Sequence, residues 1–407
     1  MVPMTSRSLA EHRADVLAML PKPLALDVAL RDAVGCVVME DLVASVDVPS
    51  LAVAAWDGYA IVSADSPQAG GAPVTLPVMR DVAAGDKQGR LIPGTAARIA
   101  HGGPIPRGAD AVWPQSTQDA NQVVIDTPLA PGTGITAAGA DARSGEVLVA
   151  AGTRLASGHV AVLAACGVKV ARVIPSPRVV LVAIGSELTS GGSKAATVRE
   201  TSAVYETSGA LISALASQAG ARVVRTVVVP DDAPAVRRAV EDAAMQAECV
   251  ITMGGTSQDW RDVTVPVLEH ALDVSMVEVR VGGGTWHGLG LAGDSSKPAV
   301  VIAIPGHPTA AVTAFIGYVR DALLHLRGLR SAPSKARAGA GWASPYGFSQ
   351  VVPVARAAKD RGVVAPVGDA AHMTMRDLAR SDGLALIDES VTEVKAGDPL
   401  DVVWWER

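Results

Sequence analysis

The sequence has 407 residues and a formal net charge of −6, and its aromatic residues are limited to 2 Phe, 7 Trp and 4 Tyr. A chain of this length exceeds a single hydrophobic core, so we expect two to four domains of roughly 150 residues each. The acidic balance, the absence of long Lys/Arg runs and the few aromatic side chains available for base stacking argue against a nucleic-acid-binding or anionic-membrane protein.

The first twenty residues predict an amphipathic helix rather than a signal peptide, because acidic residues interrupt the apolar positions. No membrane span is expected, since Arg172 and Arg178 break the longest apolar tract. Cys36, Cys166 and Cys249 lie in apolar stretches without a CxxC pair, which is typical of reduced, buried thiols and not of a zinc site. The sequence therefore predicts a soluble, cytoplasmic protein.

Residues 28–175 contain short β-rich segments separated by Gly and Pro, which predict one or two small β domains. The unusual feature of this region is Asp57, which stands between Trp56 and Gly58 in an otherwise apolar stretch. We expect Asp57 to be buried, and a buried carboxylate needs hydrogen-bond partners or a function. An Asx-turn at a hairpin is the alternative explanation.

Helices and strands alternate between about residues 177 and 328. Continuous β-branched runs predict strands buried on both faces of a parallel sheet at Arg178–Ile184, Cys249–Met253 and Ala299–Ile304, with a further strand at 221–229. Helices are expected at 205–219, 233–247, 262–272 and 308–326. This alternation predicts a three-layer, doubly wound α/β domain.

The three buried runs each stop at glycine or Pro-Gly and then become polar, in the segments 185–187, 254–257 and 305–308. Ligands bind beyond the carboxyl ends of the strands in open α/β sheets, so we expect a small-molecule site there. Gly254 and Gly255 would let the backbone approach an anion, and Ser257 would add a hydroxyl. An ordinary strand-to-loop turn is the alternative for this segment.

Several single residues at these strand ends allow two interpretations. Glu187 is either a functional carboxylate, which binds hydrated Mg²⁺ or accepts a hydrogen bond from a hydroxyl, or an acid in the first turn of a helix. Asp231 is either a functional acid or a helix N-cap. His307 either binds a ligand or packs at the surface, while Pro308 suits the first position of a helix.

GLGLAG at 288–293 matches the dinucleotide-binding pattern GxGxxG. The five residues that follow, 294–298, break the chain instead of starting a helix, so we reject a dinucleotide site. After Gly328, the small residues of 331–341 predict a linker, and the remaining short strands predict a separate C-terminal β-barrel-like domain.

Six motifs, taken in order, resemble those of the MoeA/gephyrin-E family of molybdopterin molybdenumtransferases. They are WDGYA (56–60), HGGPIP with GADAV (101–112), GADARSGEVLVAAGTRL (139–155), IGSEL (184–188), GGTS with a following Asp (254–262) and IPGHP (304–308). The resemblance covers nearly the whole chain. It implies an α/β molybdopterin-binding domain (1–27 and 176–330), a linker β domain (28–45 and 146–175), a small β domain (46–145) that completes the cleft of a second subunit, and a C-terminal β-barrel-like domain (331–407).

The resemblance also implies an activity and a homodimer with shared active sites. Family members insert molybdate into adenylated molybdopterin and release AMP in the presence of Mg²⁺, which is a step of molybdenum cofactor biosynthesis. The enzyme that adenylates molybdopterin and the recipient molybdoenzymes are the implied protein partners. The alternative is a non-catalytic or substrate-shifted paralogue that binds a molybdopterin-type ligand as a scaffold or carrier.

Site residues follow from the resemblance position by position. The functional carboxylates fall on Asp57, Asp141, Glu187, Asp231 and Asp262, and the expected metal ligands are Glu187, Asp231 and Asp262. The substrate-binding positions fall on His101, Glu206, Gly254, Gly255, Ser257, Arg280, Pro305, Gly306, His307 and Pro308. Cleavage of a pyrophosphate link needs a metal held by carboxylates together with donors for anionic oxygens, which agrees with this set.

The chain departs from the family pattern at positions expected to face phosphate or molybdate. His101 replaces a threonine, Gly283 replaces a second lysine, and His307 replaces an asparagine. The apolar segment 51–54 replaces a polar one, and Glu206 lies in the segment that replaces DSN. The sequence therefore predicts retained acid chemistry and altered recognition of anions.

Overall fold

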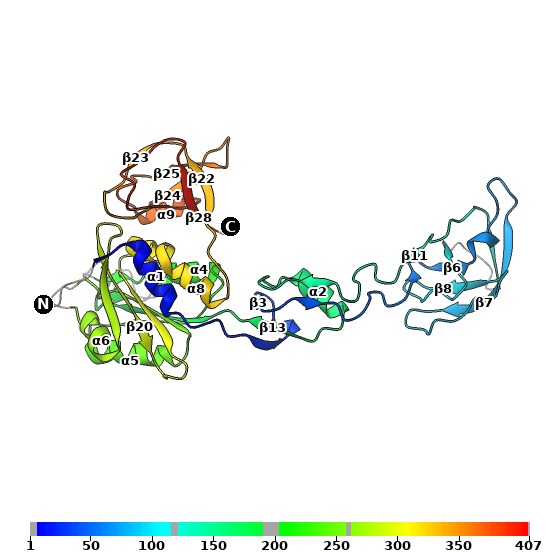
Figure 1. Cartoon of the computed structure of the whole chain (residues 1–407), viewed down its shortest axis with the longest axis horizontal. Helices are drawn as coiled ribbons and strands as arrows, with labels where there is room; N and C mark the ends of the chain where they lie inside the picture. Colours follow the sequence, from blue (N-terminus) through cyan, green and yellow to red (C-terminus); the bar gives the residue numbers. More distant parts are fainter. Residues whose placement is uncertain (1–5, 115–120, 190–202, 258–261, 406–407) are drawn as a thin grey trace. The chain divides into compact units, whose positions relative to one another are not determined.

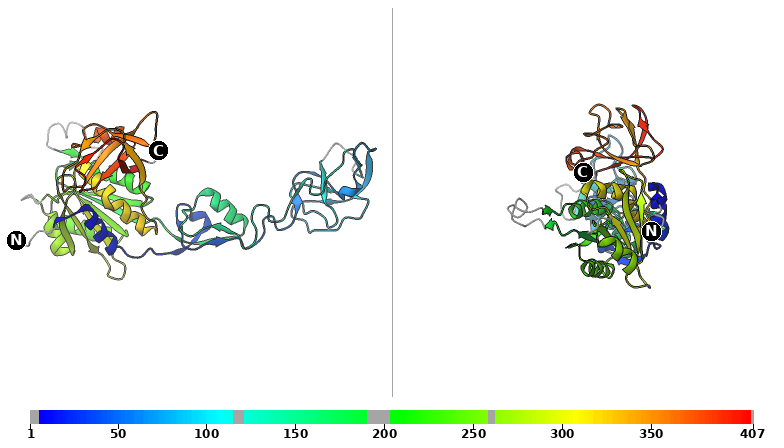
Figure 2. Two further views of the ribbon diagram at one scale, coloured as in Figure 1. Left: turned by 45° about the horizontal axis from the view of Figure 1, so that its top comes forward. Right: turned by 90° about the vertical axis from the view of Figure 1, so that its left-hand side faces the viewer.

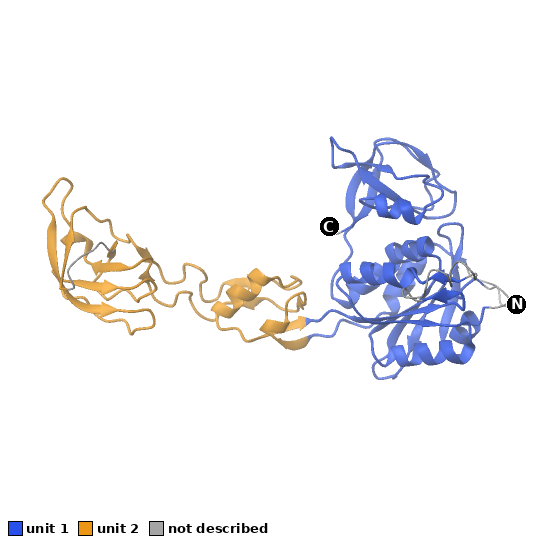
Figure 3. Ribbon diagram, turned by 180° about the vertical axis from the view of Figure 1, so that it is seen from behind, with its two compact units in different colours: residues 1–25, 174–407 blue, residues 26–173 orange. Residues whose placement is uncertain are grey.

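The structure is a computed structural model that describes residues 6–114, 121–189, 203–257 and 262–405. The chain divides into two compact units, which are coloured separately in Figure 3. Unit 1 contains Met1–Ala25 and Ile174–Arg407, and unit 2 contains Leu26–Val173. No helix in the described ranges is long and apolar enough to cross a membrane.

Unit 1 contains a seven-stranded sheet with the order β1-β19-β20-β21-β18-β14-β17. Its strands are β1 (Ser6–Arg7), β14 (Arg178–Ile184), β17 (Arg222–Val229), β18 (Cys249–Met253), β19 (Val274–Val279), β20 (Thr285–Ala292) and β21 (Ala299–Ile304). The neighbours β17, β14, β18 and β21 are parallel, but β20 is antiparallel to both β19 and β21. The runs predicted to lie in a parallel sheet, β14, β18 and β21, are parallel to one another. Strand β20, which the sequence did not predict, adds an antiparallel part on one side, because short loops and not helices join β19, β20 and β21.

Helices cover both faces of this sheet (Figures 1 and 2). Alternate strand residues such as Leu181 and Ile251 pack with α1 (Leu9–Met19), α4 (Ser208–Gln218), α7 (Pro308–Ala314) and α8 (Arg320–Leu326). The intervening residues, such as Val182 and Val250, pack with α5 (Ala233–Ala244) and α6 (Thr264–Ala271). Since side chains alternate across a strand, the continuous apolar runs fill both cores. The predicted three-layer α/β architecture is confirmed.

The helices differ from their predicted ranges mainly at the ends. The helix expected at 205–219 begins three residues later, because Val204–Tyr205 forms the short strand β16, which pairs with β15 (Leu188–Thr189). The helix expected at 262–272 begins at Thr264. The helix expected at 308–326 contains a π-helical turn, η3 (Phe315–Val319), between α7 and α8.

The first five residues of GLGLAG lie in strand β20, Gly293 follows the strand, and the motif forms no phosphate-binding loop. A Cβ on Gly288 would lie 2.6 Å from Met276 Sδ, and a Cβ on Gly290 would lie 2.6 Å from Val274 Cα. Both contacts are with strand β19, so these glycines allow close packing within the sheet. The rejection of a dinucleotide site agrees with this placement.

Unit 2 contains several small sheets with separate cores. A three-stranded sheet, β2 (Leu26–Ala29), β13 (Val170–Ile174) and β3 (Val37–Val38), accompanies η1 (Leu30–Asp32) and α2 (Ser157–Ala165). A five-stranded sheet contains β10 (Gln122–Ile125), β7 (Val74–Val82), β8 (Ala96–Ile99), β6 (Gly58–Ile61) and β9 (Ala111–Pro114), with η2 (Ser63–Asp65) following β6. The pairs β4 (Leu42–Val43) with β12 (Val147–Val149), and β5 (Val53–Ala54) with β11 (Ile135–Thr136), complete the unit.

The C-terminal part of unit 1 is a closed barrel of β22 (Ser334–Ala338), β25 (Val363–Pro366), β24 (Gln350–Arg356), β26 (Gly383–Ile387) and β28 (Pro399–Trp404). Helix α9 (Met375–Arg380) and the pair β23 (Trp342–Ala343) with β27 (Glu393–Val394) accompany it. Strand β22 lies within the segment predicted to be a linker, so that prediction is wrong for Ser334–Ala338. The predicted barrel is confirmed.

Candidate functional site

The polar segments that follow β14, β17, β18 and β21 form what we call the strand-end edge: residues 185–187, 230–232, 254–257, 262 and 305–308. Gly254 N donates to Ile304 O at 3.2 Å, and Gly185 N donates to Val229 O at 3.0 Å. A Cβ on Gly306 would lie 2.8 Å from Gly254 Cα. The sheet therefore brings these segments together at one edge, as the sequence predicts.

Gly254 and Gly255 take left-handed backbone conformations, with φ of +100° and +66°. A Cβ on Gly254 would lie 2.3 Å from Ile184 O, and one on Gly255 would lie 1.9 Å from Thr264 Oγ1. Neither position can accept a side chain without movement of its neighbours. The segment is thus more constrained than an ordinary turn, and a ligand can approach its backbone closely.

Asp262 lies beside this turn and is partly buried. Its Oδ1 accepts a hydrogen bond from Thr264 N at 2.9 Å, and it would lie 3.3 Å from a Cβ on Gly255. The carboxylate is therefore fixed at the start of α6. Thr264 is a residue that the sequence analysis missed, since a buried threonine carries no signal of its own in the sequence.

Asp231 and Ser186 connect the ends of β17 and β14. Ser186 N donates to Asp231 Oδ2 at 2.8 Å, and Asp231 N donates to Ser186 Oγ at 3.0 Å. The helix N-cap is instead Asp232, whose Oδ1 accepts from Ala235 N at 2.9 Å. The N-cap alternative for Asp231 is therefore wrong. Ser186 lies in the predicted polar segment 185–187, but the sequence did not indicate its pairing with Asp231.

Glu187 is exposed and precedes β15, so it is not an acid in the first turn of a helix. Both of its carboxylate oxygens would lie 2.7 Å from a Cβ on Gly185. Glu187 thus folds back over the glycine at the end of β14. Its position next to Ser186 brings it close to the hydrogen-bonded pair of Asp231 and Ser186.

Glu206 accepts a hydrogen bond from Gly209 N through Oε1, so it stabilises the start of α4. Ser208 Oγ, from the same turn, donates to Gly306 O at 2.6 Å. This contact joins the start of α4 to the 305–308 turn. Glu206 therefore lies near the strand-end edge, in a helix-capping role.

The turn at 305–308 starts a helix. His307 is the N-cap, Pro308 is the first residue of α7, and Pro305 is buried. The exposed His307 ring lies with Nδ1 2.9 Å from Thr309 Oγ1. Ser257 is also exposed, so both side chains at this edge face outward from the core.

Arg280 follows β19 and is not brought to the segments above. Its Nη2 lies 3.2 and 3.3 Å from the two carboxylate oxygens of Glu389, in the C-terminal part of the chain. Ser349 N also donates to Arg280 O at 2.9 Å. Gly283, at the position of the lost lysine, has a φ of +98°, and a Cβ added to it would have nothing within 4 Å.

Asp57, His101 and Asp141 lie in unit 2. Asp57 Oδ1 accepts from His101 N at 2.7 Å, so these two residues are brought together. The expectation that Asp57 is buried is wrong: it is exposed just before β6, whereas the residues of that strand are buried. Asp141 is exposed, and its backbone N donates to Val48 O at 2.9 Å.

Within the described ranges, no group of three or more His, Cys, Asp or Glu side chains could hold a metal ion. Asp231 and Asp262 each accept a backbone N–H, while Glu187 is exposed. Mg²⁺ is commonly bound by one or two carboxylates together with substrate phosphates, so it does not need a preformed cage. Glu187 and Asp231, on either side of Ser186, are compatible with that kind of site.

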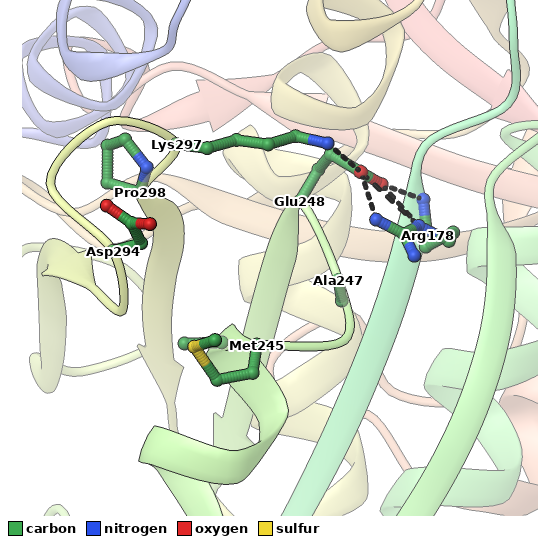
Figure 4. A pocket seen from close by; sticks show the side chains of 8 residues that line it. Arg178, Met245, Ala247, Glu248, Asp294, Lys297 and Pro298 are labelled. Carbon is green, nitrogen blue, oxygen red and sulfur yellow. Dashed lines mark hydrogen bonds and ion pairs between the residues drawn. The ribbon is translucent and has the colours of Figure 1, made fainter.

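A cavity of about 170 Å³ lies at the opposite, amino-terminal ends of β14, β18 and β21 (Figure 4). Glu248 pairs there with Arg178 at 2.6 Å and with Lys297 at 3.7 Å. Burial raises the pKa of Glu248, but its hydrogen bonds with Arg178 outweigh burial and lower the pKa overall. These charges compensate one another, and no predicted site residue lines this cavity.

Three family descriptions match successive parts of the chain. "MoeA N-terminal region (domain I and II)" matches residues 7–167, "Probable molybdopterin binding domain" matches 180–325, and "MoeA C-terminal region (domain IV)" matches 335–405. Together they span most of the two units.

Similar proteins are known from bacteria and archaea. "Molybdopterin molybdenumtransferase 2" of Mycobacterium tuberculosis (strain ATCC 25618 / H37Rv) is 31% identical over 414 residues, which cover 97% of this chain and 99% of the relative. "Molybdopterin molybdenumtransferase" of Staphylococcus aureus (strain N315) is 30% identical over 311 residues, covering 75% and 72%. The crystal structure of "molybdopterin biosynthesis moea protein" from Pyrococcus horikosii matches with a TM-score of 0.77 and 25% identity, covering 99% of this chain and 100% of that one.

Proposed function

The chain belongs to the MoeA family of molybdopterin molybdenumtransferases, and on that basis we propose that it inserts molybdate into adenylated molybdopterin and releases AMP. This reaction is a step of molybdenum cofactor biosynthesis. The observation that carries the proposal is the strand-end edge, where Gly254, Gly255 and Asp262 are held in fixed positions. The relatives carry the name of a transferase, and nothing favours the non-catalytic alternative.

The backbone of the GGTS turn suits the anionic part of such a substrate. Consecutive left-handed glycines allow a phosphate or molybdate oxygen to approach the main-chain N–H groups without a steric barrier. Ser257 and His307, both exposed at this edge, add side-chain donors. We assign substrate binding to Gly254, Gly255, Ser257 and the 305–308 turn.

The carboxylates of the edge suit the cleavage of the link to AMP. The reciprocal hydrogen bonds of Asp231 with Ser186 fix the end of β17 beside Glu187. Glu187 and Asp231 would hold Mg²⁺ together with the substrate phosphates, and the ion would neutralise charge on the phosphate oxygens. Asp262, which accepts a hydrogen bond from Thr264 N, would orient the reacting groups.

Unit 2 contributes the remaining candidate residues, Asp57, His101 and Asp141. We propose a homodimer in which these residues of one subunit complete the strand-end edge of the other. We also propose that the protein acts in the cytoplasm. An adenylating enzyme would supply its substrate, and a molybdoenzyme would receive its product. The altered residues at His101, Gly283 and His307 would change the recognition of the anion and not the acid chemistry.

The test is a turnover assay with the purified full chain. The protein is incubated with adenylated molybdopterin, Mg²⁺ and molybdate, and AMP is measured by chromatography while the product is added to an apo-molybdoenzyme. We expect AMP release and reconstitution of the recipient, both dependent on the protein. AMP release no faster than in a buffer control would overturn the proposal, and a parallel sample with tungstate identifies the preferred oxyanion.

A further inference from the structure

Three arginines gather around one surface cavity of unit 2 that the proposed function does not use. The cavity measures about 350 Å³ and is lined by Gln88, Gly89, Arg90, Arg107 and Gly108. A third arginine, Arg80 of β7, packs against Gly89, because a Cβ there would lie 1.7 Å from Arg80 Nη1.

The backbone places Arg90 and Arg107 side by side. Arg107 N donates to Gly89 O at 2.8 Å, and Leu91 N donates to Arg107 O at 3.0 Å, which makes Arg90 and Arg107 partners in a parallel bridge. Side chains at paired positions project from the same face, and two like charges placed opposite each other are destabilising. The pairing therefore brings two positively charged residues close together, and an anion bound to both would offset their mutual repulsion.

A neighbouring amide orients Arg107 but does not neutralise it. Arg107 Nε donates to Gln88 Oε1 at 3.3 Å, and Gln88 Nε2 in turn donates to Ile105 O at 2.9 Å. In the part of the chain that the structure describes, Arg80, Arg90 and Arg107 form no ion pair. A neutral amide that holds a guanidinium in place leaves its charge available to a ligand.

The acidic residues nearest in sequence are engaged elsewhere. Asp81 forms a two-pronged contact with Arg98 at 2.7 and 2.9 Å. Asp86 accepts from a backbone N–H at 2.8 Å, and Asp110 accepts from the hydroxyl of Ser63 at 2.8 Å. None of these three carboxylates lines the cavity, and the charged residues of its lining are Arg90 and Arg107. The lining is therefore positive, on a chain whose net charge is −6.

We propose that this cavity binds the phosphate group of a small ligand, with Arg90 and Arg107 as its charged donors and Arg80 behind Gly89 as a supporting charge. The planar guanidinium matches tetrahedral oxyanions through paired N–H donors, and such charge-assisted hydrogen bonds are strong. The ligand is either free inorganic phosphate or a phosphate monoester. The site does not depend on the transferase activity, and it is tested by binding alone.

The experiment is calorimetric titration of the full chain in a phosphate-free buffer, with inorganic phosphate in one series and glycerol 3-phosphate in the other. We expect saturable binding that weakens as NaCl is raised, because the contacts are exposed and screened by salt. In the double variant Arg90→Gln/Arg107→Gln, binding is expected to be at least about tenfold weaker, since two charge-assisted contacts are lost. Stronger binding of glycerol 3-phosphate identifies a monoester ligand, and equal binding identifies free phosphate.

Arg154→Gln is the matched control, because Arg154 is an exposed arginine of the same unit that does not line the cavity. This variant should bind both probes as the unmodified chain does. Circular dichroism confirms that the double variant folds, as expected for two exposed side chains. The proposal is overturned by absence of saturable binding to either probe, or by equal affinity in the double variant and in the unmodified chain. Neither result depends on AMP release, so the phosphate-binding proposal can fail while the proposed transferase activity stands, and the reverse is also true.

Discussion

Gly254 and Gly255 are single residues at which the absence of a side chain allows neighbouring groups to approach the backbone closely. Their left-handed φ angles and the short distances to Ile184 O and Thr264 Oγ1 exclude any larger residue. The sequence predicts the two glycines as a site where the backbone meets a ligand. It does not predict that Thr264 is the neighbour that fixes Gly255, because this contact depends on how α6 docks beside β18.

We predict that Gly255→Ala destabilises the protein by on the order of 3 kcal/mol, since left-handed strain and a clash with Thr264 add together. Gly282→Ala is the matched control, because its φ is +57° and an added Cβ would have nothing within 4 Å. That variant should lose only about 1 kcal/mol, from backbone strain alone. Urea denaturation measures both values, and equal losses would contradict the steric account of the GGTS turn.

Prediction from the sequence fails at three places on the scale of single residues: Asp57, Arg280, and the adjacent acids Asp231 and Asp232. Asp57 is exposed, like Trp56 before it, although the strand that begins at Gly58 is buried, because Asp57 lies just before that strand. Arg280 pairs with Glu389, a partner 109 residues away that no local pattern reveals. Of two adjacent acids, only the one with the right backbone geometry becomes the cap, and the sequence contains no information on which it is.

At the scale of elements, strands with strong β-branched runs are predictable, and strands interrupted by glycine are not. β14, β18 and β21 are confirmed with the predicted bounds, because each is buried on both faces. β20 was missed because its glycines suggest a loop. Close packing against β19 and, for Gly288, also against Ala303 of β21 explains them. The π-helical turn within 308–326 was also missed, since its residues are as apolar as those of the helices on either side.

The packing of α1, β20 and η3 against one another buries two histidines, and we predict that their burial makes the stability depend on pH. His12 of α1 and His287 of β20 are buried with Tyr318 of η3, and ring centroids lie 4.6 to 5.7 Å apart. Burial lowers the pKa of His12 to about 4. Burial, together with the neighbouring His12, lowers the pKa of His287 to about 3. Both rings are therefore neutral in the folded protein near neutral pH.

The unfolded chain binds protons at these histidines below about pH 6.5, but the folded chain does not until pH 4 or 3. The contribution of these two neutral histidines to the free energy of unfolding should therefore be fully present above pH 6.5. It should fall as the pH drops toward 4, by on the order of 1 kcal/mol per pH unit for each histidine. Urea denaturation at pH 7.5, 6.0 and 5.0 measures the slope.

His12→Gln should reduce this slope by the contribution of one proton, whatever its effect on stability at neutral pH. His270→Gln is the control, because His270 is an exposed histidine that does not belong to the buried pair. A slope in the His12→Gln variant equal to that of the unmodified chain would show that the buried ring does not resist protonation.

At the scale of the whole molecule, the order of six motifs along the chain was sufficient to identify the family, and the family descriptions confirm it. The sequence also predicted the three-layer α/β architecture of unit 1 and its C-terminal β-barrel. The candidate carboxylates, however, are divided between unit 1 and unit 2. Whether they act together depends on assembly, and local sequence patterns carry no information on that.

The proposed homodimer predicts complementation between inactive variants. Asp57→Ala removes a residue of unit 2, and Asp262→Ala removes one of unit 1, so each homodimer should be inactive. Mixing and reassembling the two should give heterodimers with one intact site, and about a quarter of the unmodified activity for random exchange. Light scattering checks that dimers form. Absence of recovery in a reassembled dimer would contradict a site shared between subunits.

The most direct test of the central claim, that the strand-end edge carries the chemistry, is AMP release by Asp262→Asn compared with Asp294→Asn. Asp262 is at this edge, while Asp294 lines the cavity at the opposite ends of the strands (Figure 4). Asp262→Asn keeps an oxygen for the hydrogen bond from Thr264 N, so its urea midpoint should stay close to that of the unmodified chain. We predict that Asp262→Asn releases AMP at least about 100-fold more slowly and that Asp294→Asn stays within about twofold of the unmodified rate. Full activity of Asp262→Asn, or an equal loss in both variants, would contradict the account.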